Sequence, residues 1–396
     1  MTQTEKDKTG YIPPEIITNI FSRLPIKSLI RFQCVCKDWN SLMKTPYFIV
    51  QHHHRPFNQN FLVFKCHRRR AICLLDHEMQ VLQIQKPSTI LDDCNIIWEI
   101  VGSSNGLICL NLGKGFRCLL YLWNPVTREV CKVPTNVFQY LKRKTCGVGF
   151  GFSSIRNDHR IVKLFVCLDG VVSRVEVYSL NKGSWKKIDI GEAKGVAICF
   201  APGITCNGFI FWLAFNRCMQ CFFILRFDLT LETFTKIDIP TYLSPEYRHT
   251  LSVFENKLAM LHREPSCLSH TIDLWVIEGL SWIKIRTITD YPCFLIPQAI
   301  WRDELISKVY EDPLCGGWEG RINSTNALFN IETHEIKPLF GIYPSQLVYG
   351  YQTWHYAESV MPVSNICPKE SFRFGKNFIG FLMILGILAI VMLRLT

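Results

Sequence analysis

The chain has 396 residues and 48% of them are hydrophobic, so it is long enough for two or three domains and too apolar to be largely disordered. Its net charge is +11, and residues 1–70 alone hold twelve Lys or Arg against four Asp or Glu. No recognition helix or base-stacking array accompanies this charge, which favours solvated helix faces over a nucleic-acid site. The 18 cysteines are scattered through apolar stretches, as is typical of reduced cytosolic or nuclear proteins.

A compact block of short helices is predicted over residues 11–55, after a disordered tail at 1–10. Ile16, Ile20 and Leu24 recur at i, i+4 and i+8, and Pro25 ends this first helix. A second apolar stripe follows and is ended by a proline at position 46; it consists of Phe32, Cys36, Trp39 and Met43. About forty residues cannot supply a self-sufficient core. The block therefore packs either on a partner or on the rest of the chain.

The residues of this block favour the partner. The string IPPEII…IFSRLPIKSLIRFQCVCKDWNSL resembles the plant F-box motif over some thirty residues without a gap. This resemblance implies docking onto the Skp-type adaptor, and through it the cullin, of an SCF-type ubiquitin ligase. Carried over by position, the adaptor-facing and supporting residues would be Pro13, Ile16, Ile20, Leu24, Pro25, Leu29, Val35, Cys36 and Trp39. We expect Trp39 and Leu29 to be the principal contacts, because buried aromatic and aliphatic groups dominate interface energies.

The middle of the chain contains an internal repeat with a period near fifty. Aromatic residues begin equivalent strand-turn-strand units 48–55 residues apart, at Trp123, Tyr178, Phe227, Trp275 and Phe329. Turn residues ahead of these units keep a spacing of 47–52, at Asn105, Asn157, Asn207, Asn256 and Asp303. Two registers with nearly the same period predict repeated four-stranded units.

These units predict an all-β, kelch-like β-propeller over residues 61–356. Five units are visible, and the segment from Phe61 to Ile84 supplies a divergent sixth, which gives about six blades. Closure of the ring by a late segment such as QLVYGY (346–351) would remove exposed sheet edges. The strings GSSNGLICL, LWNPVTRE, VGFGF and DLWVIEGLSWIKI also resemble the F-box-associated domain of plant F-box/kelch proteins.

The sequence carries few motifs typical of catalytic or metal-binding sites. HExxH and phosphate-loop patterns are absent from the sequence. Cys218 and Cys221 form a lone CxxC without a second pair, and His52–His54 are three adjacent histidines of the kind usually found on a surface. We therefore expect a non-catalytic protein without cofactor or metal, and keep a propeller enzyme as an alternative.

Recognition would then fall to the loops that connect strands and blades. The longer connecting stretches are 136–146, 190–204, 241–250, 262–271 and 311–326. Within them, the candidate contacts to a protein substrate are Tyr242, Tyr247, Arg248, Trp318 and Arg321. Each of these residues could equally pack at the edge of a blade.

A hydrophobic segment at 378–394 follows a linker at 357–377. Sixteen uncharged residues, 378–393, cover roughly 24 Å as a helix, against ~30 Å for the hydrocarbon core of a bilayer. Flanking Lys and Arg side chains can make up a few ångströms. We favour a tail anchor with the bulk of the protein in the cytosol. A helix packed on the propeller and an aberrant terminus are the alternatives.

The sequence thus predicts a substrate receptor that binds an adaptor at its amino end and an unidentified protein through its propeller. A membrane-tethered interaction scaffold without a ligase role is the alternative from another class.

Overall fold

The computed structural model describes residues 12–53, 60–66, 71–76, 81–85, 97–114, 117–135, 144–167, 169–199, 203–216, 220–240, 248–263, 271–289, 294–302, 304–310, 324–338 and 354–363. The predicted tail at 1–10 and the hydrophobic segment at 378–394 lie outside these residues. None of the helices within the described ranges has the length and apolar character needed to cross a bilayer. The tail anchor therefore stays a prediction.

Four short helices form the amino-terminal block: α1 (Pro14–Ser22), α2 (Ile26–Phe32), α3 (Lys37–Met43) and α4 (Pro46–His53). Prolines set these boundaries as predicted, since Pro14 occupies the first turn of α1 and Pro25 is the N-cap of α2. The N-cap of α3 is Cys36, whose Sγ accepts a hydrogen bond from the backbone N–H of Trp39 at 3.5 Å. The predicted block of short helices is confirmed.

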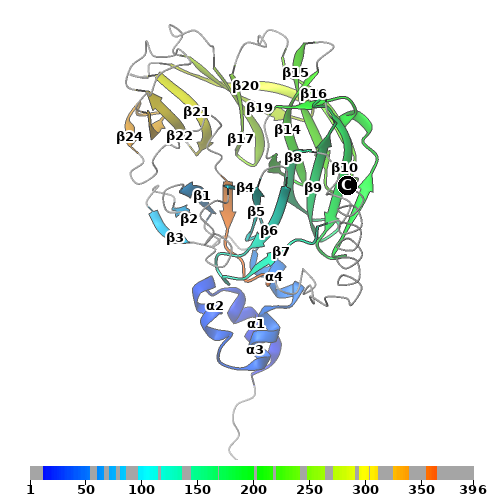
Figure 1. Ribbon diagram of the computed structural model, residues 1–396. Helices are drawn as coiled ribbons and strands as arrows, with labels where there is room; N and C mark the ends of the chain where they lie inside the picture. The colour runs from blue at the N-terminus through cyan, green and yellow to red at the C-terminus, as the bar shows by residue number, and fades with distance from the viewer. Residues whose placement is uncertain are drawn as a thin grey trace, which may run out of the picture.

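Six antiparallel sheets form the rest of the described chain (Figure 1). Blade 1 contains β1 (Asn60–Cys66), β2 (Ala71–Leu75), β3 (Val81–Gln85) and β25 (Trp354–Ala357). Blade 2 contains β4 (Ile97–Ser104), β5 (Leu107–Lys114), β6 (Arg117–Trp123) and β7 (Val130–Lys132). Blade 3 contains β8 (Lys144–Ser153), β9 (Asp158–Val166), β10 (Val172–Ser179) and β11 (Ser184–Ile188).

Blade 4 has a divided first strand and contains β12 (Ala197–Ile198), β13 (Ile204–Cys206), β14 (Phe209–Asn216), β15 (Cys221–Asp228) and β16 (Phe234–Asp238). Blade 5 contains β17 (Arg248–Phe254), β18 (Lys257–Arg263), β19 (Ile272–Glu278) and β20 (Ser281–Ile288). Blade 6 contains β21 (Phe294–Trp301), β22 (Glu304–Tyr310), β23 (Ser324–Asn330) and β24 (Ile336–Pro338). A short 3₁₀ helix, η2 (Gly191–Ala193), precedes blade 4. The prediction of about six blades is confirmed.

The ring is closed by pairing two segments from opposite ends of the chain. Strand β25 adds to the inner edge of blade 1, where Tyr356 lies opposite Phe61 and His355 opposite Leu62. Closure by a late segment is therefore confirmed. The segment 346–351 that was expected to provide it lies outside the described residues, and 354–357 provides the strand instead.

Both registers of the repeat appear in the blades. The five aromatics of the first register are all buried on the third strands; they are Trp123, Tyr178, Phe227, Trp275 and Phe329. Four of the five predicted turn residues adopt φ of 47–59°, namely Asn105, Asn157, Asn207 and Asn256. In blade 6 the residue with positive φ is Arg302 (53°), one position before the predicted Asp303, which lies outside the described residues.

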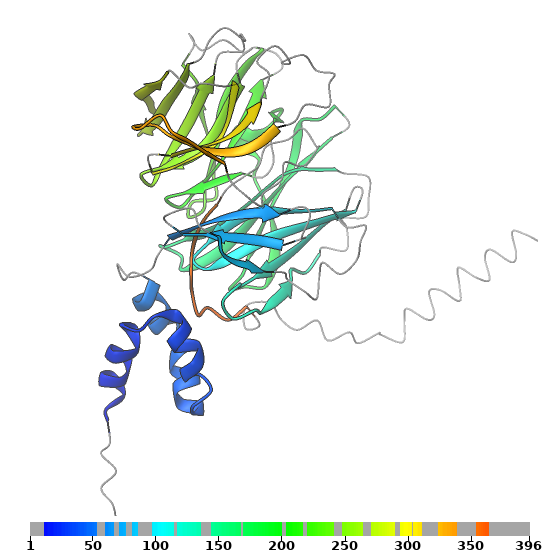
Figure 2. The ribbon, with the colours of Figure 1, turned by 90° about the vertical axis from the view of Figure 1, so that its left-hand side faces the viewer.

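The connections define two ends of the ring. Turns between first and second strands, such as Asn105–Gly106, and turns between third and fourth strands, such as 124–129, lie at one end, which we call the turn end. The opposite loop end carries the starts of the first strands and the ends of the second strands, where Arg248 pairs with Arg263. The four helices form a separate layer beside blade 2 (Figures 1 and 2). They pack at the turn end, because Val126 contacts their core.

Candidate functional site

The helical block exposes several large apolar side chains. Ile16 and Ile20 share one face of α1 at i+4 spacing and are 51% and 49% exposed, and Ile12, just before the helix, is 53% exposed. Val35, in the connection from α2 to α3, is 60% exposed, and Cys36 beside it is also exposed. Exposing isoleucines costs solvation free energy, so such a surface indicates a docking site.

The nine predicted adaptor residues divide into two groups. Five are on the surface of the block, with Ile16, Ile20, Pro25, Val35 and Cys36 exposed. Pro13, Leu24 and Trp39 are half-buried, and Leu29 is 0% exposed. The expectation that Leu29 makes a principal contact is wrong, because its side chain is fully enclosed within the block. The predicted set omitted Ile12, although Ile12 begins the string that resembles the F-box motif.

An aromatic core explains why Leu29 and Trp39 point inward. The Trp39 ring meets Phe21 edge-on with centroids 4.8 Å apart, and meets Phe32 at 5.7 Å. Leu29 joins the same core with Phe48. Trp39 keeps part of its surface exposed, so its role as a contact stays a prediction.

The histidines at the end of α4 differ from the surface cluster that was expected. His52 is only 5% exposed, and its Nε2 is 3.0 Å from the carbonyl oxygen of Leu24. Its ring also stacks on Phe48 with centroids 5.9 Å apart. His52 therefore ties α4 to the end of α1, which corrects the surface interpretation for this residue. The side chain of His53 and the whole of His54 lie outside the described part of the chain.

The predicted contacts to a protein substrate cannot be placed as side chains. Tyr242, Tyr247, Trp318 and Arg321 lie outside the described residues, and Arg248 is described only by its backbone at the start of β17. The strand ends that flank these stretches are at the loop end, whereas the helical block packs at the turn end. The described strand ends that flank these stretches and the helices thus lie at opposite ends of the ring.

A cavity of about 220 Å³ lies among the inner strands. It is lined mainly by residues of β4, β13, β17, β21 and β25, including Ser103, Thr205, Asn207, Gln298 and His355. The His355 ring packs against Trp301 with centroids 4.7 Å apart. Among the described residues that line it there is no carboxylate, Lys or Arg.

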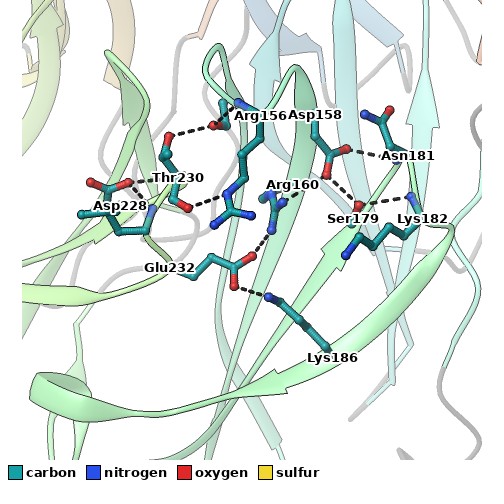
Figure 3. Close-up of polar contacts among 12 residues, drawn as sticks. Arg156, Asp158, Arg160, Ser179, Asn181, Lys182, Lys186, Asp228, Thr230 and Glu232 are labelled. Carbon is teal, nitrogen blue, oxygen red and sulfur yellow. Dashed lines mark hydrogen bonds and ion pairs between the residues drawn. The ribbon is translucent and has the colours of Figure 1, made fainter.

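A buried charged network joins blades 3 and 4 (Figure 3). Arg160, 4% exposed, binds Asp158 at 3.3 Å within blade 3 and Glu232 across the blade interface. Glu232 also binds Lys186, whose pKa is lowered by partial burial and by the neighbouring cations. The hydroxyl of Ser179 donates to Asp158 at 2.6 Å. Each carboxylate here is held by a cation, so the network holds two blades together and offers no free base.

The described residues also contain no cluster of metal-binding side chains. In the described ranges, no three His, Cys, Asp or Glu side chains are close enough to hold an ion. Cys221 begins β15 opposite Asn216, and Cys218 lies outside the described residues.

Two family comparisons match this architecture. The F-box domain matches residues 11–51, and the F-box associated beta propeller domain matches residues 47–296. A putative F-box/kelch-repeat protein from Arabidopsis thaliana is 26% identical over 298 residues, covering 70% of this chain and 80% of that protein. An F-box protein from the same plant is 28% identical over 290 residues, covering 71% and 73%.

Among solved structures, TolB from Acinetobacter baumannii is similar with a TM-score of 0.45 and 12% identity, over 78% of this chain and 70% of that chain. The family match spans most of the helical block and of the propeller. The chain belongs to the F-box proteins that carry an F-box associated beta-propeller domain.

Proposed function

We propose that this protein is the substrate-recognition subunit of an SCF-type ubiquitin ligase. The observation that carries the proposal is the group of exposed isoleucines at Ile16 and Ile20 on α1 and at Ile12 just before it, within a matched F-box domain. These side chains would bind the Skp-type adaptor, while the loop end of the propeller would bind the target. The receptor would act by proximity, because it raises the effective concentration of target lysines near a ubiquitin-charged enzyme.

Adaptor binding can be tested with a pair of exposed isoleucines. The variant Ile16→Asp/Ile20→Asp should bind purified Skp-type adaptor at least about 30-fold more weakly, as expected for loss of a hot spot worth ~2 kcal/mol. The matched control is Ile283→Asp, which changes an isoleucine of similar exposure (42%) on β20 of the propeller. Calorimetric titration gives both affinities. Unchanged affinity in the double variant would overturn the proposal.

The same double variant helps to identify the target. It should keep the propeller folded and hold its target without passing it to the ligase. Mass spectrometry of proteins captured by the variant, compared with wild type, would reveal targets that wild type depletes. A receptor that never co-purifies with adaptor and cullin would instead support the interaction scaffold, and substrate turnover by the propeller alone would support an enzyme.

A further inference from the structure

Residues 358–363 form a second connection between the propeller and the F-box, and we call this segment the strap. It follows β25, the strand that closes the ring. Val360 is 2% exposed and belongs to the F-box core with Phe21, Leu29 and Phe48. Met361 and Val363, on the same strap, pack instead into the core between blades 2 and 3. Side chains of one short segment thus complete the cores of both domains.

Blade 2 holds the strap through the turn between its third and fourth strands. Asn124 is 0% exposed, and its Nδ2 donates to the carbonyl oxygens of Ser359 at 2.9 Å and Met361 at 2.8 Å. Glu129, at the other side of the turn, accepts from the backbone N–H of Val363 at 2.6 Å. These bonds satisfy buried backbone groups, which otherwise carry a desolvation cost.

Comparison with the equivalent turns of other blades distinguishes the role of Asn124 in its own turn from its role in binding the strap. Its Oδ1 accepts from the backbone N–H groups two and three residues on, at 2.9 and 3.4 Å. The equivalent residues Asp228 in blade 4 and Asn330 in blade 6 accept the same two bonds, at 2.7–2.9 Å. Because Asp228 has no amide nitrogen, the turn needs only the acceptor oxygen. The amide nitrogen of Asn124 is therefore available for the strap alone.

Gly106 shows a second position where blade 2 differs from its repeats. Gly106 and Gly208 follow asparagines in equivalent turns, with φ of 81° and 80°. A Cβ atom at Gly208 would meet nothing within 4 Å. At Gly106 it would lie 2.1 Å from the Cβ and 2.8 Å from the backbone nitrogen of Ser359. Only at Gly106 does a side chain collide with the strap.

We propose that the strap fixes the orientation of the F-box on the propeller, and that Asn124 and Gly106 are positioning residues for ubiquitin transfer. The role in ubiquitin transfer rests on the proposed ligase function, whereas the role of the strap in fixing the F-box orientation does not. A receptor that acts by proximity needs a defined geometry between its two binding ends. The chain passes directly from the F-box to the propeller, and Val126 of blade 2 also contacts the F-box core. The strap adds a further packed attachment, through Val360.

The structural part is tested by amide hydrogen exchange on matched variants. Asn124→Asp keeps the acceptor for the turn and replaces the two strap donors by a carboxylate oxygen, while Asn330→Asp makes the same change without a strap. Gly106→Ala and Gly208→Ala form a second pair with equal backbone strain. We expect exchange in α1–α4 to rise at least about tenfold in both strap variants and to stay as in wild type in both controls. Equal exchange within each pair would overturn the inference.

The positioning role is tested in a reconstituted ligase that contains adaptor, cullin and ubiquitin-charged enzyme. Mass spectrometry maps the propeller lysines that receive ubiquitin. Strap variants should spread modification over more lysines while their adaptor affinity changes less than about threefold, because the F-box surface itself is unaltered. An unchanged lysine pattern would overturn the positioning role. Failure of wild type to bind adaptor would instead defeat the proposed function, and the exchange result would still decide the role of the strap.

Discussion

At the residue scale, two buried histidines of blade 5 lie close to blade 4. In blade 5, His249 and His262 are both buried, and their Nδ1 atoms are 3.3 Å apart. Phe222 of blade 4 contacts His249 edge-on, with ring centroids 6.0 Å apart. Burial, together with His262, lowers the pKa of His249 to about 4. The imidazole is therefore neutral in the folded protein over the physiological range.

This burial predicts acid sensitivity. The unfolded chain binds a proton at His249 below its ordinary pKa of ~6.5, whereas the folded chain does so only near pH 4, so stability falls as pH falls through this window. Between pH 7 and pH 5 the group should contribute a loss of about 2 kcal/mol. Urea unfolding at both values measures it. His249→Gln should reduce the loss; an equal loss in wild type and variant would contradict the assignment.

At the scale of elements, the F-box helices separate residues that hold the domain together from residues that face outward. Leu29→Ala should destabilise the block by roughly 2–5 kcal/mol, because the side chain is fully enclosed. Ile16→Ala, with about half of its side chain exposed, should cost less than about 1 kcal/mol. Amide hydrogen exchange in α1–α4 gives both values. A larger cost for Ile16→Ala would show that α1 packs differently from the arrangement described.

The sequence predicted these elements unevenly, for physical reasons. Helix ends and blade turns were predictable because proline and asparagine act locally, through fixed φ and tolerance of positive φ. The burial of Leu29 was not, because helical periodicity gives a stripe without saying whether it faces its own block or a partner. The strap was also missed. Its contacts join Asn124 to Ser359 and Met361, more than 200 residues along the chain, and no local pattern reports such a pairing.

At the scale of the whole molecule, ring closure makes the stability of each blade depend on the others. Tyr356 on β25 is 0% exposed and packs in the core between blades 1 and 2. Tyr356→Ala should cost about 3–5 kcal/mol and lower the unfolding midpoint of the whole ring. Thermal unfolding followed by near-ultraviolet circular dichroism tests this. The control is Leu280→Ala, an exposed residue (59%) between β19 and β20; a small cost for Tyr356→Ala, similar to that of the control, would show that the ring does not depend on its closing strand.

The strap also gives the order of synthesis a consequence. The F-box helices leave the ribosome first, but Val360, which their core requires, is made only after all six blades. A chain released early, before the strap is made, therefore lacks one side chain of the F-box core. Under the proposed function, an unfinished copy would therefore bind the adaptor less well than a copy whose ring has closed.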